Sequence, residues 1–271
     1  MMKYFSFLSV LLASFLIGKG QQRIVSLHGT ISEMICAFGL EDKLVGVDVT
    51  STYPASLQQK PKVGHNRTIS AENILALRPD LVVGMQGEFN SAAVEQLKGA
   101  GIKVTLFPSE YDVEGTRKLL TALGAALGQQ AKAVTLLKDF DSQVAALKIT
   151  PVGRKVLMVY ARGVGSLQVA GSGTSLDKMI QLAGGANAVP FDNFKPLTSE
   201  SLVAANPDVI VLFDSGLKSV GGIDGFLKVP GVNMTNAGKA KKIVSMDGAL
   251  LSGFGLRLPQ AIAELNKKIK S

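Results

Sequence analysis

The chain contains two histidines, His28 and His65. His65 lies in the stretch GHNRTISAEN, between a Pro-Lys turn and a segment that carries a helix-start signal. An imidazole held out by a loop can bind a metal ion or exchange a proton near neutral pH, and the alternative is a loop histidine that faces water. Two histidines are too few for a zinc or manganese site built from several imidazoles and carboxylates.

Motifs of enzyme catalysis are absent from the sequence, which has no GxSxG, no Walker loop and no HExxH. The Gly-rich run GSGTSLDK, residues 171–178, opens a helix and could present backbone N–H groups to an anion. A plain turn is the alternative for this run. The sequence therefore favours a protein that binds its ligand without converting it.

The first 20 residues have the pattern of a signal peptide. Lys3 precedes the uncharged apolar run of residues 4–18, and Gly18 and Gly20 suit cleavage after Gly20. The run is short for a membrane span, and an uncleaved anchor is the alternative. Cleavage would remove Lys3 and Lys19 without any acid, so the formal charge would fall from +8 to +6. We therefore expect an exported protein.

Composition narrows the choice of partners. The Lys and Arg residues are dispersed, with no basic run and no interleaved aromatic residues, so we expect no nucleic-acid partner. The positive charge either attracts a small anionic ligand or belongs to a solvated surface. The lone cysteine, Cys36, can form no internal disulfide and lies in the apolar pattern ISEMICAFG, which favours a buried position.

After residue 20 the sequence alternates apolar runs typical of strands with amphipathic runs typical of helices. The predicted strands are RIVSL, KLVGVDV, LVVG, IKVTLF, KVLMVYA and DVIVLFD. Thr30 with Glu33 predicts a capping box at the first helix, and Gly39 predicts its end. A long helix without Gly or Pro is predicted from residue 129 to residue 149. This alternation indicates an α/β fold with parallel strands.

The two halves of the chain repeat each other. Residues 70–83 and 198–211 match at a constant offset of 128, and each copy has a hydroxyl N-cap, a first-turn Glu, a Pro-Asp break and an apolar strand. The alternative is a pair of unrelated αβ units. We predict a signal peptide over 1–20, Rossmann-like lobes with central parallel sheets over 21–128 and 151–271, and one linking helix over 129–150. A cleft between two lobes is a favoured place for a ligand.

The chain beyond the signal peptide resembles the periplasmic substrate-binding proteins of bacterial haem ABC importers, which belong to the class III periplasmic binding proteins. The segments that carry the resemblance are RIVSLHGTISEMICAFG, KVGHNRTISAENILALRPDLVV, VAGSGTSLDKMIQLAGGANAV, FKPLTSESLVAANPDVIVL and DGALLSGFGLR. The resemblance implies two α/β lobes joined by one helix. It also implies a non-enzymatic carrier that takes haem in the cleft and delivers it to an inner-membrane permease. We expect the carrier to be a monomer.

The resemblance also implies an iron ligand. In the family, a Gly-Tyr-x-Arg loop supplies a tyrosine phenolate to haem iron, and His65 stands at that tyrosine position. A neutral imidazole is a standard axial ligand of haem iron. His28 is a candidate second ligand or a polar wall of the cleft, with a solvent-exposed helix start as the alternative. For Tyr160 a core-facing strand position is the main expectation, and phenolate ligation remains open.

Three basic side chains are candidates to bind the haem propionates, because the planar guanidinium of Arg and the ammonium group of Lys both pair with a carboxylate. Arg67 matches the family's arginine, Lys195 is its counterpart at the offset of 128, and Arg162 stands near the place of an iron-binding histidine in some relatives. Each is otherwise a solvated surface charge. Two roles are possible for Met85, Phe191 and Phe254: apolar contact with a porphyrin, or ordinary packing in the core.

Glu72 and Glu200 are the matched first-turn glutamates of the repeat. In the wider group one such Glu on each lobe pairs with Arg on the permease, and the alternative is a helix N-terminal charge worth about 0.3–1 kcal/mol. A ferric siderophore or a corrinoid such as vitamin B12 is the alternative ligand within the same class. An exported enzyme or an adhesion module is the alternative from another class.

Overall fold

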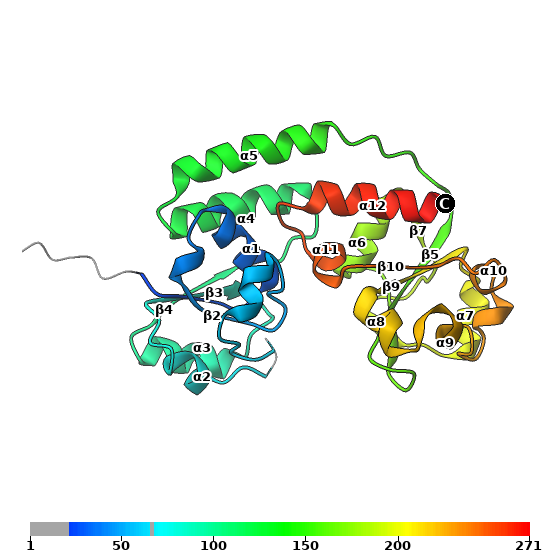
Figure 1. Ribbon diagram of the computed structural model, residues 1–271, viewed down its shortest axis with the longest axis horizontal. Coiled ribbons are helices and arrows are strands. Elements are labelled where there is room, and N and C mark those ends of the chain that lie inside the picture. The colour runs from blue at the N-terminus through cyan, green and yellow to red at the C-terminus, as the bar shows by residue number, and fades with distance from the viewer. Residues whose placement is uncertain (1–21, 66–67) are drawn as a thin grey trace, which may run out of the picture.

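The computed structural model describes residues 22–65 and 68–271. The predicted signal peptide and Arg67 lie outside the described residues. Within them the chain forms two sheets with helices on both faces, and the helical segments α4, α5 and α12 run along one edge of the pair (Figure 1). The α/β class and the two-lobed architecture predicted from the sequence are confirmed. No helix among the described residues is long and apolar enough to cross a membrane.

The N-terminal lobe is built on a four-stranded, all-parallel sheet with the order β2-β1-β3-β4. Its strands are β1 (Ile24–Ser26), β2 (Leu44–Val47), β3 (Leu81–Met85) and β4 (Lys103–Phe107). Its helices are α1 (Gly29–Ala37), α2 (Ala71–Leu75) and α3 (Ser91–Gly99), with short 3-10 turns at Glu41–Lys43 and Ala55–Gln59. Successive residues of β3 alternate between two buried apolar clusters, so both faces of the sheet are covered.

The C-terminal lobe has a six-stranded sheet with the order β10-β9-β5-β6-β8, and β7 also pairs with β5. The strands are β5 (Lys155–Ala161), β6 (Leu167–Ala170), β7 (Ala186–Asn187), β8 (Phe194–Pro196), β9 (Val209–Phe213) and β10 (Ile243–Met246). The helices are α6 (Ser175–Leu182), α7 (Ser199–Ala205), α8 (Asp214–Ser219), α9 (Gly222–Phe226), α10 (Asn236–Lys239), α11 (Gly248–Ser252) and α12 (Leu258–Lys270), with a 3-10 turn at Val232–Met234.

The sheet of the C-terminal lobe departs from the expected parallel arrangement on one side. Strand β6 runs antiparallel to β5, and β8 runs antiparallel to β6. The β5–β6 connection is a tight turn, in which Arg162 N donates to Ser166 O at 2.9 Å. A short connection of this kind permits only an antiparallel neighbour, since a parallel pair needs a longer crossover.

Helix α5 (Gln130–Ala145) packs beside α4 (Val113–Ala126) and contributes to the cores of both lobes. Ala133 lies in an apolar cluster of the N-terminal lobe, and Phe140 lies in one of the C-terminal lobe. The helix ends at Ala145, earlier than the predicted residue 149, and residues 146–154 continue without helix. The chain therefore passes between lobes through a 16-residue helix and an extended segment.

The sequence repeat corresponds to equivalent elements. Ser70 and Thr198 are the N-cap residues of α2 and α7, and β3 and β9 follow at matching positions. The predicted capping box of α1 is wrong, because the N-cap residue is His28 and its Nδ1 accepts a hydrogen bond from Thr30 N at 3.2 Å. Glu33 makes an ion pair with Arg257 instead.

Candidate functional site

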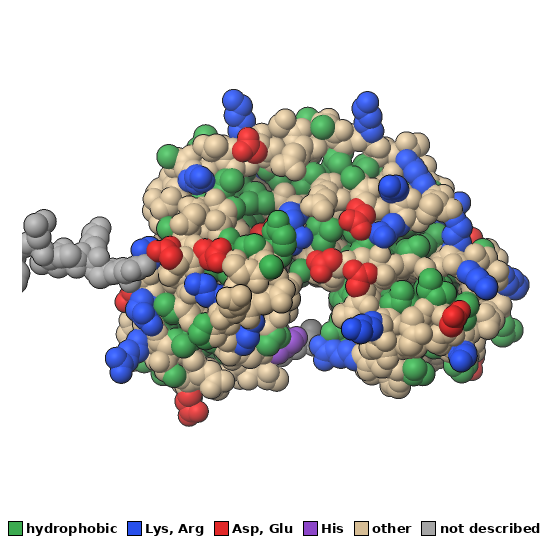
Figure 2. All heavy atoms as spheres, in the orientation of Figure 1, with side chains coloured by type: hydrophobic (Ala, Val, Ile, Leu, Met, Phe, Trp, Pro, Cys, Tyr) green, Lys and Arg blue, Asp and Glu red, His purple; other side chains and the backbone are tan. Residues whose placement is uncertain are grey.

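The carboxyl ends of the strands in both lobes face a common opening. In the N-terminal lobe, His28 follows β1 and Met85 ends β3. In the C-terminal lobe, residues 249–257 follow β10. Side chains from both sets line one inter-lobe pocket. In α/β proteins, ligands bind outside the carboxyl ends of the strands. Figure 2 shows the molecule hollowed between its two halves, with a histidine on one side of the opening and Lys and Arg side chains on the other.

His65 is held at the carboxyl edge of the N-terminal sheet by its own backbone. Gly64 O accepts from Val49 N at 3.1 Å, two residues beyond the end of β2. His65 O accepts from Thr68 N at 2.7 Å, which fixes the turn that follows. Val49, which the Gly64 bond brings beside this segment, is 44% exposed.

Across the opening, Arg162 directly follows β5 and is braced against Tyr160. Arg162 Nε donates to Tyr160 Oη at 2.8 Å, and its guanidinium carbon lies 5.2 Å from the centre of the Tyr160 ring. The Tyr160 ring packs edge-on against Phe213, with ring centroids 5.6 Å apart. Tyr160 is thus partly buried at the carboxyl end of β5, and its oxygen is held beside a permanent positive charge.

Lys195 lies at the same end of the C-terminal sheet. It pairs with Val169 of β6, which pairs with Val159 near the end of β5. Its Nζ lies 4.9 Å from the centre of the Phe191 ring, a distance at which a cation and an aromatic face attract each other. The adjacent Phe194 is 43% exposed. Cationic and apolar side chains therefore lie together on this wall.

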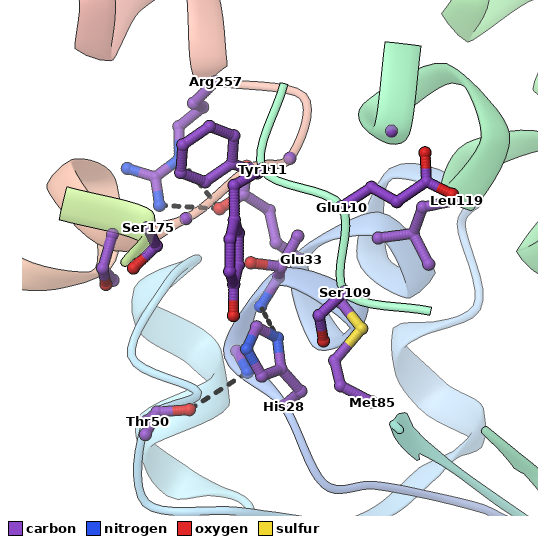
Figure 3. A pocket seen from close by; sticks show the side chains of 18 of the residues that line it. His28, Glu33, Thr50, Met85, Ser109, Glu110, Tyr111, Leu119, Ser175 and Arg257 are labelled. Atoms are coloured by element: carbon purple, nitrogen blue, oxygen red, sulfur yellow. Dashed lines mark hydrogen bonds and ion pairs between the residues drawn. The ribbon is translucent and has the colours of Figure 1, made fainter. Parts of the chain in front are cut away.

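The inter-lobe pocket has a volume of about 240 Å³ and contains His28, Met85 and Phe254 of the sequence candidates (Figure 3). Pockets that enclose a ligand of drug size usually measure about 300–1,000 Å³. The volume of this pocket is below that range, so the pocket alone encloses less space than a ligand of drug size needs. Among the described candidates, His65, Arg162 and Lys195 are outside the lining of this pocket.

The hydrogen bond at His28 sets its tautomer. Because Nδ1 accepts from Thr30 N, the proton of a neutral imidazole must sit on Nε2. That nitrogen lies 3.7 Å from Glu88 Oε2. Ligation of iron through Nε2 would require its lone pair, and the proton would then move to Nδ1 and break the cap of α1. The geometry thus suits His28 to a donor in the wall of the cleft.

Sequence reasoning missed the contacts of Arg257, Glu33 and Tyr53 between the lobes. Arg257 Nε and Nη2 donate to Glu33 Oε2 at 2.8 and 2.6 Å, and the guanidinium carbon lies 3.8 Å from the centre of the Tyr53 ring. All three residues line the inter-lobe pocket. The only sequence signal was a Glu in the first helix, which fits a helix cap equally well.

Tyr111 is, after Tyr53, a second tyrosine of the pocket that was not predicted from the sequence. It lines the inter-lobe pocket and lies against Phe254, with ring centroids 5.3 Å apart. Burial raises the pKa of its phenol, and the charge of Glu88 adds to this rise. A phenol of this kind stays protonated at neutral pH and acts as a polar wall.

Glu72 and Glu200 are both exposed in the first turns of α2 and α7. The two helices are equivalent in the repeat, so each lobe presents one carboxylate from the same position. No group of three or more His, Cys, Asp or Glu side chains within residues 22–65 and 68–271 could hold a metal ion.

A model of the periplasmic binding protein family matches residues 24–250. The chain belongs to this family. Members are binding components of transport systems, which confirms the expectation of a non-enzymatic protein and indicates a periplasmic or otherwise extracytoplasmic location.

Comparison with solved structures gives the same family. The chain is similar to the periplasmic heme-binding protein BhuT in complex with two hemes, with 39% identity, coverage of 93% of this chain and 98% of that one, and a TM-score of 0.87. It is also similar to the periplasmic heme-binding protein RhuT from Roseiflexus sp. RS-1 in apo form, with 36% identity, the same coverage and a TM-score of 0.87. The vitamin B12-binding protein of Salmonella typhi is 29% identical over 196 residues, which are 70% of this chain and 71% of that protein.

Proposed function

We propose that this protein is the periplasmic haem carrier of an ABC importer. The observation that carries the proposal is its similarity, at 39% and 36% identity over nearly the whole chain, to two periplasmic heme-binding proteins. An opening between two sheet edges, with an imidazole on one side and cations on the other, supports it. One face of the haem would lie against each lobe.

His65 is the proposed iron ligand from the N-terminal lobe. Its backbone is fixed on both sides, so little freedom is lost when the imidazole binds. Tyr160 is the proposed ligand from the C-terminal lobe, because its oxygen lies near the carboxyl end of β5 beside Arg162 and a tyrosine oxygen is a known haem ligand. His28 is proposed as a hydrogen-bond donor in the cleft wall, in place of a second ligand.

Arg162 and Lys195 are proposed to bind the propionates. A guanidinium has five N–H donors, so the bond to Tyr160 leaves Arg162 with capacity for a carboxylate. Lys195 offers a point charge above Phe191. Arg67 retains the same proposed role on the sequence resemblance alone.

Delivery to the permease is proposed to use Glu72 and Glu200. Their exposure and their equivalent positions in α2 and α7 support docking of both lobes at once. We also propose a cleaved signal peptide over residues 1–20, a monomeric mature protein, and lobes divided at residues 128 and 151.

A corrinoid is the second candidate ligand, because the vitamin B12-binding relative covers 70% of this chain. A saturated cobalt centre would not need His65. The two ligands are separated by titrating purified mature protein with haemin and with cyanocobalamin, and measuring each by isothermal calorimetry. The proposal predicts tight binding of haemin and at least 100-fold weaker binding of cyanocobalamin, and the reverse order would overturn it.

A further inference from the structure

We propose that Lys62 is a positioning residue for the iron ligand His65. The inference rests on the proposed function, since it concerns how the haem-binding imidazole is held. Lys62 does not touch the proposed ligand site; it connects the segment that ends at His65 to the neighbouring loop of residues 48–60.

The backbone of the His65 segment is held by hydrogen bonds to the end of β2. Val47 N donates to Pro61 O, Val63 N to Val47 O, and Val49 N to Gly64 O, at 3.0, 3.0 and 3.1 Å. This short parallel ladder extends β2 and holds residues 61–64 in place. It stops one residue before His65, so orientation of the imidazole depends on what else steadies the segment.

The loop of residues 48–60 is held by hydrogen bonds within itself and to helix α1. Asp48 is fully buried, and its carboxylate accepts from Ser51 Oγ at 2.6 Å and from Thr50 N at 3.0 Å. Ser51 Oγ is also 2.7 Å from Ser32 Oγ in α1. Thr50 Oγ1 accepts from Gly29 N at 3.1 Å, a bond drawn in Figure 3. The loop is therefore rigidly attached to the start of α1.

Lys62 joins the His65 segment to the loop of residues 48–60. Its Nζ donates to Ser51 O at 2.9 Å and to Leu57 O at 3.0 Å, so one ammonium group joins the His65 segment to two points within the loop. Burial of the ammonium lowers the pKa of Lys62, and the Asp48 charge opposes this change. A flexible lysine that gives up water for two backbone carbonyls is held in one conformation.

The same loop also contacts the C-terminal lobe. In the sequence, Tyr53 lies between Ser51 and Leu57, whose carbonyls Lys62 binds. The guanidinium carbon of Arg257 lies 3.8 Å from the centre of the Tyr53 ring. A continuous set of contacts thus runs from Arg257 through the loop and Lys62 to the His65 segment. Groups that hydrogen-bond directly to a metal ligand change metal affinity about 10–100-fold when they are removed, and Lys62 acts one step further out, so we expect the lower end of this range.

The test compares Lys62→Met, which keeps the aliphatic stem, with Lys62→Arg, which keeps the donor. Lys60→Met is the matched control, because it removes the same charge two residues away. Each protein is titrated with haemin. The position and width of the Soret band are recorded with and without about 10 mM imidazole, an excess of the free ligand over the protein.

We expect Lys62→Met to bind haemin about 10-fold more weakly, with a broadened Soret band that added imidazole sharpens. Lys62→Arg and Lys60→Met should match the wild type. A Lys62→Met protein with the wild-type band and affinity would overturn the inference, and so would one whose apo form has lost its fold, since Lys62 would then maintain structure. The proposed function fails separately, if the wild-type spectrum does not depend on His65.

Discussion

Arg257 donates two hydrogen bonds to a single carboxylate oxygen of Glu33, at 2.8 and 2.6 Å, and so joins the C-terminal lobe to helix α1 of the N-terminal lobe. The two side chains are only 20% and 12% exposed. A charge-assisted bond that is mostly shielded from water contributes more to stability than an exposed ion pair. The relative position of the lobes therefore depends on this pair as well as on α5.

Substitution Glu33→Gln should lower the free energy of unfolding by about 1–3 kcal/mol, because it leaves the mostly buried Arg257 charge without its counter-charge. Urea denaturation followed by circular dichroism measures the change. Glu114→Gln is the matched control, since Glu114 is 60% exposed in its pair with Arg117 and solvent screens that pair. Equal effects of the two substitutions would show that the inter-lobe pair has no special weight.

Substitution Tyr160→Phe should weaken haemin binding about 10-fold and shift its absorption spectrum. It removes the proposed phenolate ligand and the acceptor of the Arg162 hydrogen bond, while the apolar contact with Phe213 remains. Tyr111→Phe is the control, because that phenol lines the inter-lobe pocket and is not bonded to Arg162. An unchanged spectrum in Tyr160→Phe would remove Tyr160 from the coordination sphere.

The thiol of Cys36 should be unreactive in the folded protein. Cys36 is only partly buried, in contrast to the sequence prediction, but this partial burial, with a smaller contribution from the charge of Glu41, raises the pKa of its thiol to about 12, so almost no thiolate exists at neutral pH. Iodoacetamide at pH 8 should label the native protein far more slowly than the protein unfolded in urea, as mass spectrometry can show. Equal labelling rates in the two states would contradict this burial.

Asp208 should contribute stability that disappears in acid. Hydrogen bonds from Asn236 Nδ2 and Lys155 N, both at 3.0 Å, lower its pKa, with the amide of Asn236 the larger cause. A lowered folded pKa means that the stability is present above the unfolded value of about 3.9 and is lost as the pH falls through the folded value.

The wild type should therefore be about 1 kcal/mol more stable than Asp208→Asn at pH 7, and the gap should close on acidification below about pH 4. Thermal melts between pH 7 and pH 3 test this, with Asp139→Asn on the exposed face of α5 as the control. If the stability difference between the two proteins increased in acid, a lowered pKa of Asp208 could not be its cause.

Much of the architecture could be predicted from the sequence because it is repeated. The matched segments 70–83 and 198–211 gave α2, β3, α7 and β9 with their N-cap residues. Strands β6 and β8 were not predicted, since they have only four and three residues and carry exposed positions on this side of the sheet. Short strands of this kind lack the long apolar run that identified β5.

The candidate site was predictable as residue types but not as contacts. The position of His65 in its motif pointed to a metal ligand, whereas the role of His28 depends on which nitrogen accepts from Thr30 N. Likewise, Tyr160 has the spacing of an ordinary strand residue, and only the 2.8 Å bond from Arg162 marks its oxygen as special. Tertiary hydrogen bonds of this kind leave no local pattern in the sequence.

We propose that the imidazole of His65 binds the iron of a haem carried between the lobes. The direct measurement is the absorption spectrum of haemin with the purified mature wild type, with His65→Ala and with His28→Ala. We expect a sharp Soret shift in the wild type that is lost in His65→Ala and kept in His28→Ala. A shift that survives in His65→Ala, or no shift in the wild type, would contradict it.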